Sequence, residues 1–139
     1  MLPASGREQL ASLMQVHGVL PTEQRLEIAQ VLFARPQHLS AEQILAQVNA
    51  AGGSVSKATV YNTLGLFVEK GLIREVIVDP QRVFYDPTTH AHHHFYNLGT
   101  GELTDIDAAD VVLQSLPSLP EGTEVAGVDV IIRLRPQPA

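Results

Sequence analysis

The sequence predicts an α+β protein with two small domains, residues 1–86 and 87–139. Apolar residues recur at helical spacing up to Gly71, and short strand-like runs follow. The balance of charged residues changes near the boundary between these two domains. Up to Arg82, seven basic residues balance seven acidic ones, whereas from Asp86 onward eight acidic residues face two basic ones. This shift favours two domains with different tasks.

Three amphipathic helices are predicted in the first part of the chain. Each combines an apolar stripe with residues that begin or end helices. Thr22 and Ser40 are good N-cap residues, and Gln43 completes a capping box with Ser40. Glycines end the first and third helices. The predicted helices are 8–16, from Thr22 to before Pro36, and from Ser40 to the glycine pair at 52–53.

A fourth helix and a strand pair follow. The helix starts at Ser56 and closes at Gly71, and the runs LIREVIV and VFY flank a turn at 79–82. Short helices followed by a two-stranded wing make the winged-helix arrangement, in which the N-terminal residues of the recognition helix enter the major groove of double-stranded DNA. Serine-capped helices with small polar N-termini also occur in many other proteins. The candidate DNA-binding residues are Ser56, Lys57, Thr59, Tyr61 and Asn62.

The most unusual feature is a histidine cluster. Four of the six histidines lie within residues 90–94, and three of them are consecutive. Imidazole readily binds transition metals near neutral pH. Residues 92–98 are predicted to form a strand, Gly99 and Thr100 a tight turn, and residues 101–106 the return strand.

Strand alternation places His92 and His94 on one face and His93 on the other. A two-residue turn pairs the strands so that His94 lies opposite Asp105 and His92 opposite Asp107. Such a nitrogen and oxygen set suits Fe²⁺, Mn²⁺ or Zn²⁺, and two histidines could also ligate haem iron. Asp107 more naturally caps a helix, which is expected to run to residue 116.

The last segment, residues 124–134, is predicted to be a long strand rich in β-branched residues. A small α/β domain of this kind cannot bury both faces of its sheet alone, so we expect a homodimer. The chain has no cysteine, which excludes disulfides and thiolate metal sites. No apolar run approaches a membrane span and the N-terminus lacks a signal pattern, so we expect a cytoplasmic protein with no membrane partner.

Four segments together resemble the ferric uptake regulator (Fur) family: PTEQRLEIAQVLF, HLSAEQIL, SKATVYNTLGLFVEKGLI and HHHFYNLGTGELTDID. They are spread over almost the whole chain. Within the family, HHHFY and the ending VAGVDVIIRLRP are most similar to the iron response regulator (Irr) branch. The resemblance implies a dimeric, metal-responsive repressor that controls iron and haem genes, with the histidine run as an iron or haem contact.

The resemblance also implies a ligand set. His38 matches a histidine of the DNA-binding domain and Asp86 an acidic hinge residue, and both join the three residues of the hairpin. The implied metal ligands are His38, Asp86, His92, His94 and Asp105.

A second family site is less complete. His93 could serve it and His90 could compensate, but Gly127 and Val112 stand where relatives place a histidine and a glutamate. The family's sulfur zinc site is absent, because Asn97 and Thr100 occupy the positions of its first cysteine pair.

Two other functions fit parts of the sequence. A metal or haem storage module would bind the ion without binding DNA. A metallohydrolase would use three histidines and an aspartate to activate water at an open coordination position. The sequence offers no placed general base and no substrate-cleft pattern, so we do not expect an enzyme.

Overall fold

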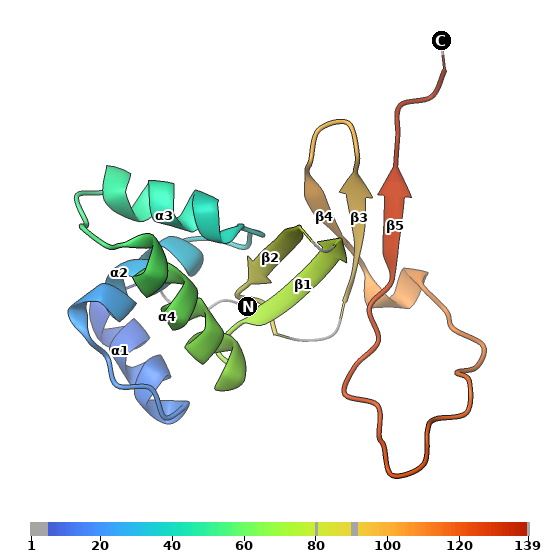
Figure 1. The fold of residues 1–139 in the computed structure, drawn as a ribbon, viewed down its shortest axis with the longest axis horizontal. Coiled ribbons are helices and arrows are strands. Elements are labelled where there is room, and N and C mark those ends of the chain that lie inside the picture. Colours follow the sequence, from blue (N-terminus) through green and yellow to red (C-terminus); the bar gives the residue numbers. More distant parts are fainter. Residues whose placement is uncertain (1–5, 80, 90–91, 139) are drawn as a thin grey trace. The chain divides into compact units, whose positions relative to one another are not determined.

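The computed structural model of the chain describes residues 6–79, 81–89 and 92–138 (Figure 1). The chain divides into two compact units, Met1–Thr89 and His90–Ala139. The N-terminal unit carries four helices and a two-stranded sheet, and the C-terminal unit carries a three-stranded sheet. This is the α+β architecture that the sequence predicts.

Three helices of the N-terminal unit begin at the capping residues that the sequence predicts. Thr22 Oγ1 accepts a hydrogen bond from the Arg25 N–H, Ser40 forms the predicted capping box with Gln43, and Ser56 Oγ accepts from the Thr59 N–H. The helices are α1 (Arg7–Val16), α2 (Glu23–Leu32), α3 (Ala41–Ala50) and α4 (Lys57–Glu69).

Gly71 follows α4 with a φ of 79°, a left-handed conformation that glycine adopts at no steric cost. The chain then forms the antiparallel strands β1 (Arg74–Asp79) and β2 (Arg82–Asp86), which make the predicted wing. The four helices and the wing together give the N-terminal unit the winged-helix fold.

The core of the N-terminal unit consists of side chains from the inner faces of its helices. Phe67 of α4, Ile28 of α2 and Ile44 of α3 are completely buried and belong to one hydrophobic cluster. Burial of such a side chain contributes roughly 1.5–3 kcal/mol. This packing makes the unit a stable support for the exposed N-terminus of α4.

The sheet of the C-terminal unit has the strand order β4–β3–β5 (Figure 1). Strand β3 (His93–Asn97) pairs antiparallel with β4 (Leu103–Ile106) and parallel with β5 (Ile131–Leu134). The turn between β3 and β4 is closed by Asn97 Oδ1, which accepts hydrogen bonds from the backbone N–H groups of Gly99 and Thr100 at 2.9 and 3.1 Å.

Two predictions about this unit are wrong. Asp107 does cap a helix, accepting from the Ala109 N–H, but the helix is a single 3-10 turn, Ala108–Asp110, and does not reach residue 116. The predicted strand over 124–134 forms only at Ile131–Leu134. Val112 is 83 % and Val125 46 % exposed, so these apolar residues have no packed surface in the single chain. Short helices and strands depend on such packing, because local propensity alone is too weak.

Candidate metal centre

A backbone bridge in the N-terminal unit sets two predicted ligands side by side. The Leu39 N–H donates to the Tyr85 carbonyl at 3.1 Å, and the Tyr85 N–H donates to the Leu39 carbonyl at 2.7 Å. Because the bridge is antiparallel, the residue before Leu39 lies opposite the residue after Tyr85. These residues are His38 and Asp86, and their Nε2 and Oδ2 atoms are 3.0 Å apart.

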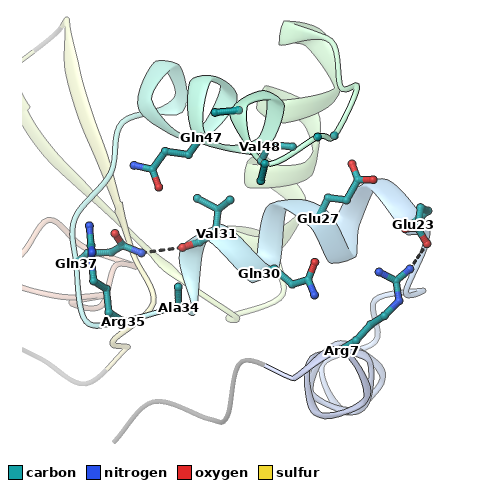
Figure 2. Close-up of a pocket in the computed structure, with 14 residues that line it drawn as sticks. Arg7, Glu23, Glu27, Gln30, Val31, Ala34, Arg35, Gln37, Gln47 and Val48 are labelled. Atoms are coloured by element: carbon teal, nitrogen blue, oxygen red, sulfur yellow. Dashed lines mark hydrogen bonds and ion pairs between the residues drawn. The ribbon is translucent and has the colours of Figure 1, made fainter.

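Hydrogen bonds from neighbouring residues fix both members of the His38–Asp86 pair. The Thr88 N–H donates to Asp86 Oδ1 at 2.8 Å, which leaves Oδ2 directed at the imidazole. On the other side, the Gln37 amide donates to the carbonyl of Val31 at 2.7 Å and so fixes the residue before His38 to the end of α2 (Figure 2). The Asp86 carboxylate is almost completely buried. A carboxylate in that position requires compensating positive charge or hydrogen bonds.

In the C-terminal unit, the hairpin has the predicted register, with His94 opposite Asp105. Asp105 Oδ1 lies 3.3 Å from His92 Nε2 and 3.4 Å from His94 Nε2. The two imidazole rings have centroids 4.6 Å apart at an angle of 60°. His92 also faces Asp105 and not Asp107, whose side chain is used as a helix cap.

The three hairpin residues fit a divalent ion. One ligand atom from each of His92, His94 and Asp105 lies within 4.8 Å of the other two. Both histidines are buried, while the Asp105 side chain is 55 % exposed. Two imidazole nitrogens and a carboxylate oxygen are the ligands that Fe²⁺, Mn²⁺ and Zn²⁺ accept. Three donors are fewer than the four of a closed zinc site.

His93 lies on the opposite face of β3 and is used differently. The Val130 N–H donates to its Nδ1 atom at 3.0 Å, which ties β3 to the segment before β5. An imidazole that accepts through Nδ1 carries its proton on Nε2 and has no lone pair there for a metal. The predicted second site, His90 with His93, therefore draws no support from His93, and His90 lies outside the described residues.

The predicted DNA-binding residues surround the N-terminus of α4. Ser56 and Thr59 serve the cap, since their hydroxyls lie 2.9 Å apart and Ser56 also accepts from the Thr59 N–H. Lys57 and Asn62 are exposed, and Tyr61 is 41 % exposed. This arrangement leaves Lys57, Tyr61 and Asn62 available to a nucleic acid.

Sequence reasoning missed a further residue here, Glu42 of α3. Its carboxylate accepts a hydrogen bond of 2.6 Å from the Tyr61 hydroxyl. The bond joins residues 19 positions apart, and no motif in the sequence marks it.

A separate groove of about 730 Å³ lies along α2 and the end of α3 (Figure 2). Its walls are mixed polar and apolar, with Glu27, Val31 and Gln47 among them, and Arg7 forms an ion pair with Glu23 at one end. None of the predicted ligands or DNA-binding residues lines this groove.

The fold and these residues define a class of protein. A winged-helix unit with an exposed, serine-capped recognition helix, in a chain whose two units both carry imidazole–carboxylate groups, is typical of a metal-binding transcription regulator. The chain belongs to the ferric uptake regulator family, which residues 17–132 match. The family description names its members as regulators.

Known proteins share both the sequence and the fold. The peroxide-responsive repressor PerR of Staphylococcus aureus is 32 % identical over 98 residues, which cover 70 % of this chain but only 66 % of that repressor's length. The manganese-bound ferric uptake regulator of Pseudomonas aeruginosa is 26 % identical, with a TM-score of 0.69 over 91 % of this chain and 97 % of the other. The Vibrio cholerae ferric uptake regulator has the same fold, with 21 % identity and a TM-score of 0.71 over 91 % and 98 % of the two chains.

Among the described residues, no helix is both long and apolar enough to cross a membrane.

Proposed function

We propose that this protein is a homodimeric, metal-responsive repressor that binds a double-stranded DNA operator and controls iron and haem homeostasis. The observation that carries the proposal is the buried pair His92 and His94, both directed at Asp105, in a chain with a winged-helix unit. The resemblance of HHHFY to the Irr branch supports iron and haem genes as the targets.

The proposed metal ligands are His38, Asp86, His92, His94 and Asp105. The hairpin supplies three donors and the His38–Asp86 pair two, and neither group alone completes a coordination sphere. We propose that both groups hold one ion. When bound, a divalent cation supplies the positive charge that the two carboxylates require.

Shared ligands would link metal occupancy to DNA binding. His38 is joined to the wing by the Leu39–Tyr85 bridge, so its position is tied to that of the DNA-binding unit. An ion that binds one arrangement of the two units more tightly than another shifts the population toward it. By thermodynamic reciprocity, DNA binding changes the affinity for metal by the same factor by which metal binding changes the affinity for DNA.

A bare ion fits the hairpin better than haem. Both Nε2 atoms lie within 3.4 Å of one carboxylate oxygen, and both rings are buried. That geometry suits a small cation, whereas haem needs access for a broad planar ring. The Pseudomonas aeruginosa relative, solved with manganese, supports the same choice.

Exposed apolar residues of the C-terminal unit support the proposed dimer. Val112, Leu116 and Val128 before β5, and Ile132 within it, are exposed in the single chain. A homodimer would cover this surface and would present two α4 helices to half-sites about 34–36 Å apart.

The proposal is tested by metal analysis of the purified protein, paired with DNA binding before and after chelation. The DNA is a pool of random duplexes, from which bound sequences are selected at stated salt. We expect bound divalent metal and a selected sequence whose affinity changes on chelation. Metal binding without affinity for any duplex would favour the storage module instead, and metal-dependent hydrolytic turnover would favour the hydrolase.

A further inference from the structure

A hydrogen bond joins Tyr61 of α4 to Glu42 of α3. The Tyr61 hydroxyl donates to the Glu42 carboxylate at 2.6 Å, a length typical of a charge-assisted bond. Glu42 lies in the first turn of α3, whereas Tyr61 lies at the exposed N-terminal end of α4. The two helices pack against each other through the core of the same unit.

The direction of this bond is fixed at neutral pH. The hydrogen bond from Tyr61 lowers the pKa of Glu42, and the same bond raises the pKa of Tyr61. The pair therefore stays a carboxylate and a neutral phenol. A phenol has one O–H donor. While that O–H donates its hydrogen bond to Glu42, the Tyr61 oxygen can only accept a hydrogen bond from another group.

Lys57 lies over the face of the Tyr61 ring. Its Nζ atom lies 5.9 Å from the centroid of the Tyr61 ring, within the range of a cation–π contact. Its positive charge also lowers the pKa of Glu42. Glu42, Tyr61 and Lys57 thus form one cluster, in which the ring has a contact on its face and a bond at its hydroxyl.

We propose that Glu42 is a positioning residue that determines base specificity, because it makes Tyr61 an acceptor-only contact in the major groove. This inference rests on the proposed DNA-binding function. In that groove adenine and cytosine present amino groups, which donate, whereas guanine and thymine present acceptor atoms at the corresponding positions. Tyr61 therefore selects the amino group of an adenine or cytosine and disfavours guanine O6 or thymine O4.

The test uses duplexes that the wild-type protein selects from a random pool, once with Mn²⁺ added and once with chelator. Each base of the selected sequence is then replaced in turn. For the wild type, we expect one position at which exchange of A or C for G or T weakens binding by about threefold to tenfold, the range of one hydrogen bond. Tyr61→Phe, which lacks the hydroxyl, is expected to lose this preference.

The decisive variants are Glu42→Gln and Glu42→Ala. Glu42→Ala removes the acceptor and frees the hydroxyl to rotate. Glu42→Gln keeps the size of the side chain, but its amide can either accept from the hydroxyl through Oε1 or donate to it through Nε2. Each is expected to reduce the preference at that position to less than about twofold, since no fixed proton direction remains. The matched control is Glu69→Gln, which removes one negative charge at the other end of α4 and should keep the preference.

Two results would overturn the inference in different ways. If both Glu42 variants change the affinity for all duplexes by one common factor and keep the wild-type base preference, Glu42 acts only through its charge. If the wild-type protein selects no duplex under either metal condition, the proposed function fails, and this inference fails with it.

Discussion

Leu39 and Tyr85 exchange two backbone hydrogen bonds, and this bridge sets the His38 imidazole 3.0 Å from the Asp86 carboxylate. Through the bridge, the backbone at Leu39 pairs with strand β2 of the wing, which also pairs with β1. A histidine and an aspartate that are 48 positions apart in the sequence thereby become neighbours within the DNA-binding unit. The proposed metal control depends on this link between ligand and wing.

Loss of the Asp86 carboxylate should weaken metal binding. Asp86→Ala removes one proposed donor and the acceptor of the Thr88 N–H. We expect the affinity for Zn²⁺ or Mn²⁺, measured by titration calorimetry, to fall by at least about tenfold. Asp110→Ala, which removes an exposed carboxylate of the C-terminal unit, is the control and should bind as the wild type does. Wild-type affinity in Asp86→Ala would exclude Asp86 as a ligand.

Haem binding, if it occurs, should not require the hairpin histidines His92 and His94. The buried His92 and His94 rings face one carboxylate oxygen, which suits an ion. Titration of the metal-free protein with haem is therefore expected to give the same Soret band in the wild type and in the His92→Ala/His94→Ala variant. A Soret shift that only the wild type shows would instead identify haem as the ligand of these histidines.

The apolar surface of the C-terminal unit should form the dimer contact. Val112 is 83 % exposed, and a charge at this position opposes burial against a second copy. Light scattering is expected to give twice 15.1 kDa for the wild type and a smaller average mass for Val112→Asp. Val16→Asp, at a residue of the N-terminal unit that is 82 % exposed, should remain dimeric. A monomeric wild type would contradict the proposed assembly.

The contact between α3 and α4 should stabilise the fold only within a pH window. Glu42 has a lowered pKa, so its contribution is present above its usual value of 4.5 and is lost as the pH falls through the lower folded value. Tyr61 has a raised pKa, so its contribution is present below its usual value of 10.0 and is lost as the pH rises through the higher folded value.

The measurement is the difference in free energy of unfolding between the wild type and Tyr61→Phe across pH. This difference should be largest between the two usual values and should shrink toward both extremes. A difference that stays constant with pH would show that the hydrogen bond contributes nothing.

The core of the N-terminal unit should depend on Phe67. The side chain is fully buried, and Phe67→Ala would leave a cavity that the helices cannot fully close. We expect a loss of about 3–5 kcal/mol in the free energy of unfolding, measured by denaturant titration. Leu20→Ala, at a residue that is 71 % exposed, should change stability by less than about 0.5 kcal/mol. Equal stability of the two variants would contradict the packing described for α4.

Local signals in the sequence predict the N-terminal unit and the hairpin register well. Caps at Thr22, Ser40 and Ser56 mark helix starts because a side-chain oxygen there satisfies a free N–H. The pairing of His94 with Asp105 follows from the length of one turn. In both cases the deciding interaction lies within a few residues of the signal.

Contacts between distant segments could not be predicted in this way. The Leu39–Tyr85 bridge and the Glu42–Tyr61 bond each depend on how whole helices pack. The helix expected after Asp107 failed for a related reason. Its apolar residues match the helical pattern, but Val112 has no surface in the single chain against which to pack.

The most direct test of metal control is fluorescence anisotropy of a selected duplex, with Mn²⁺-loaded and chelated protein compared for the wild type and for His38→Ala. Removal of His38 takes the imidazole ligand from the DNA-binding unit. We expect metal to change the DNA affinity of the wild type by at least about fivefold and to leave the DNA affinity of His38→Ala unchanged. His17→Ala, the control, should respond as the wild type does. An equal metal response in the wild type and in His38→Ala would contradict metal control of DNA binding through His38.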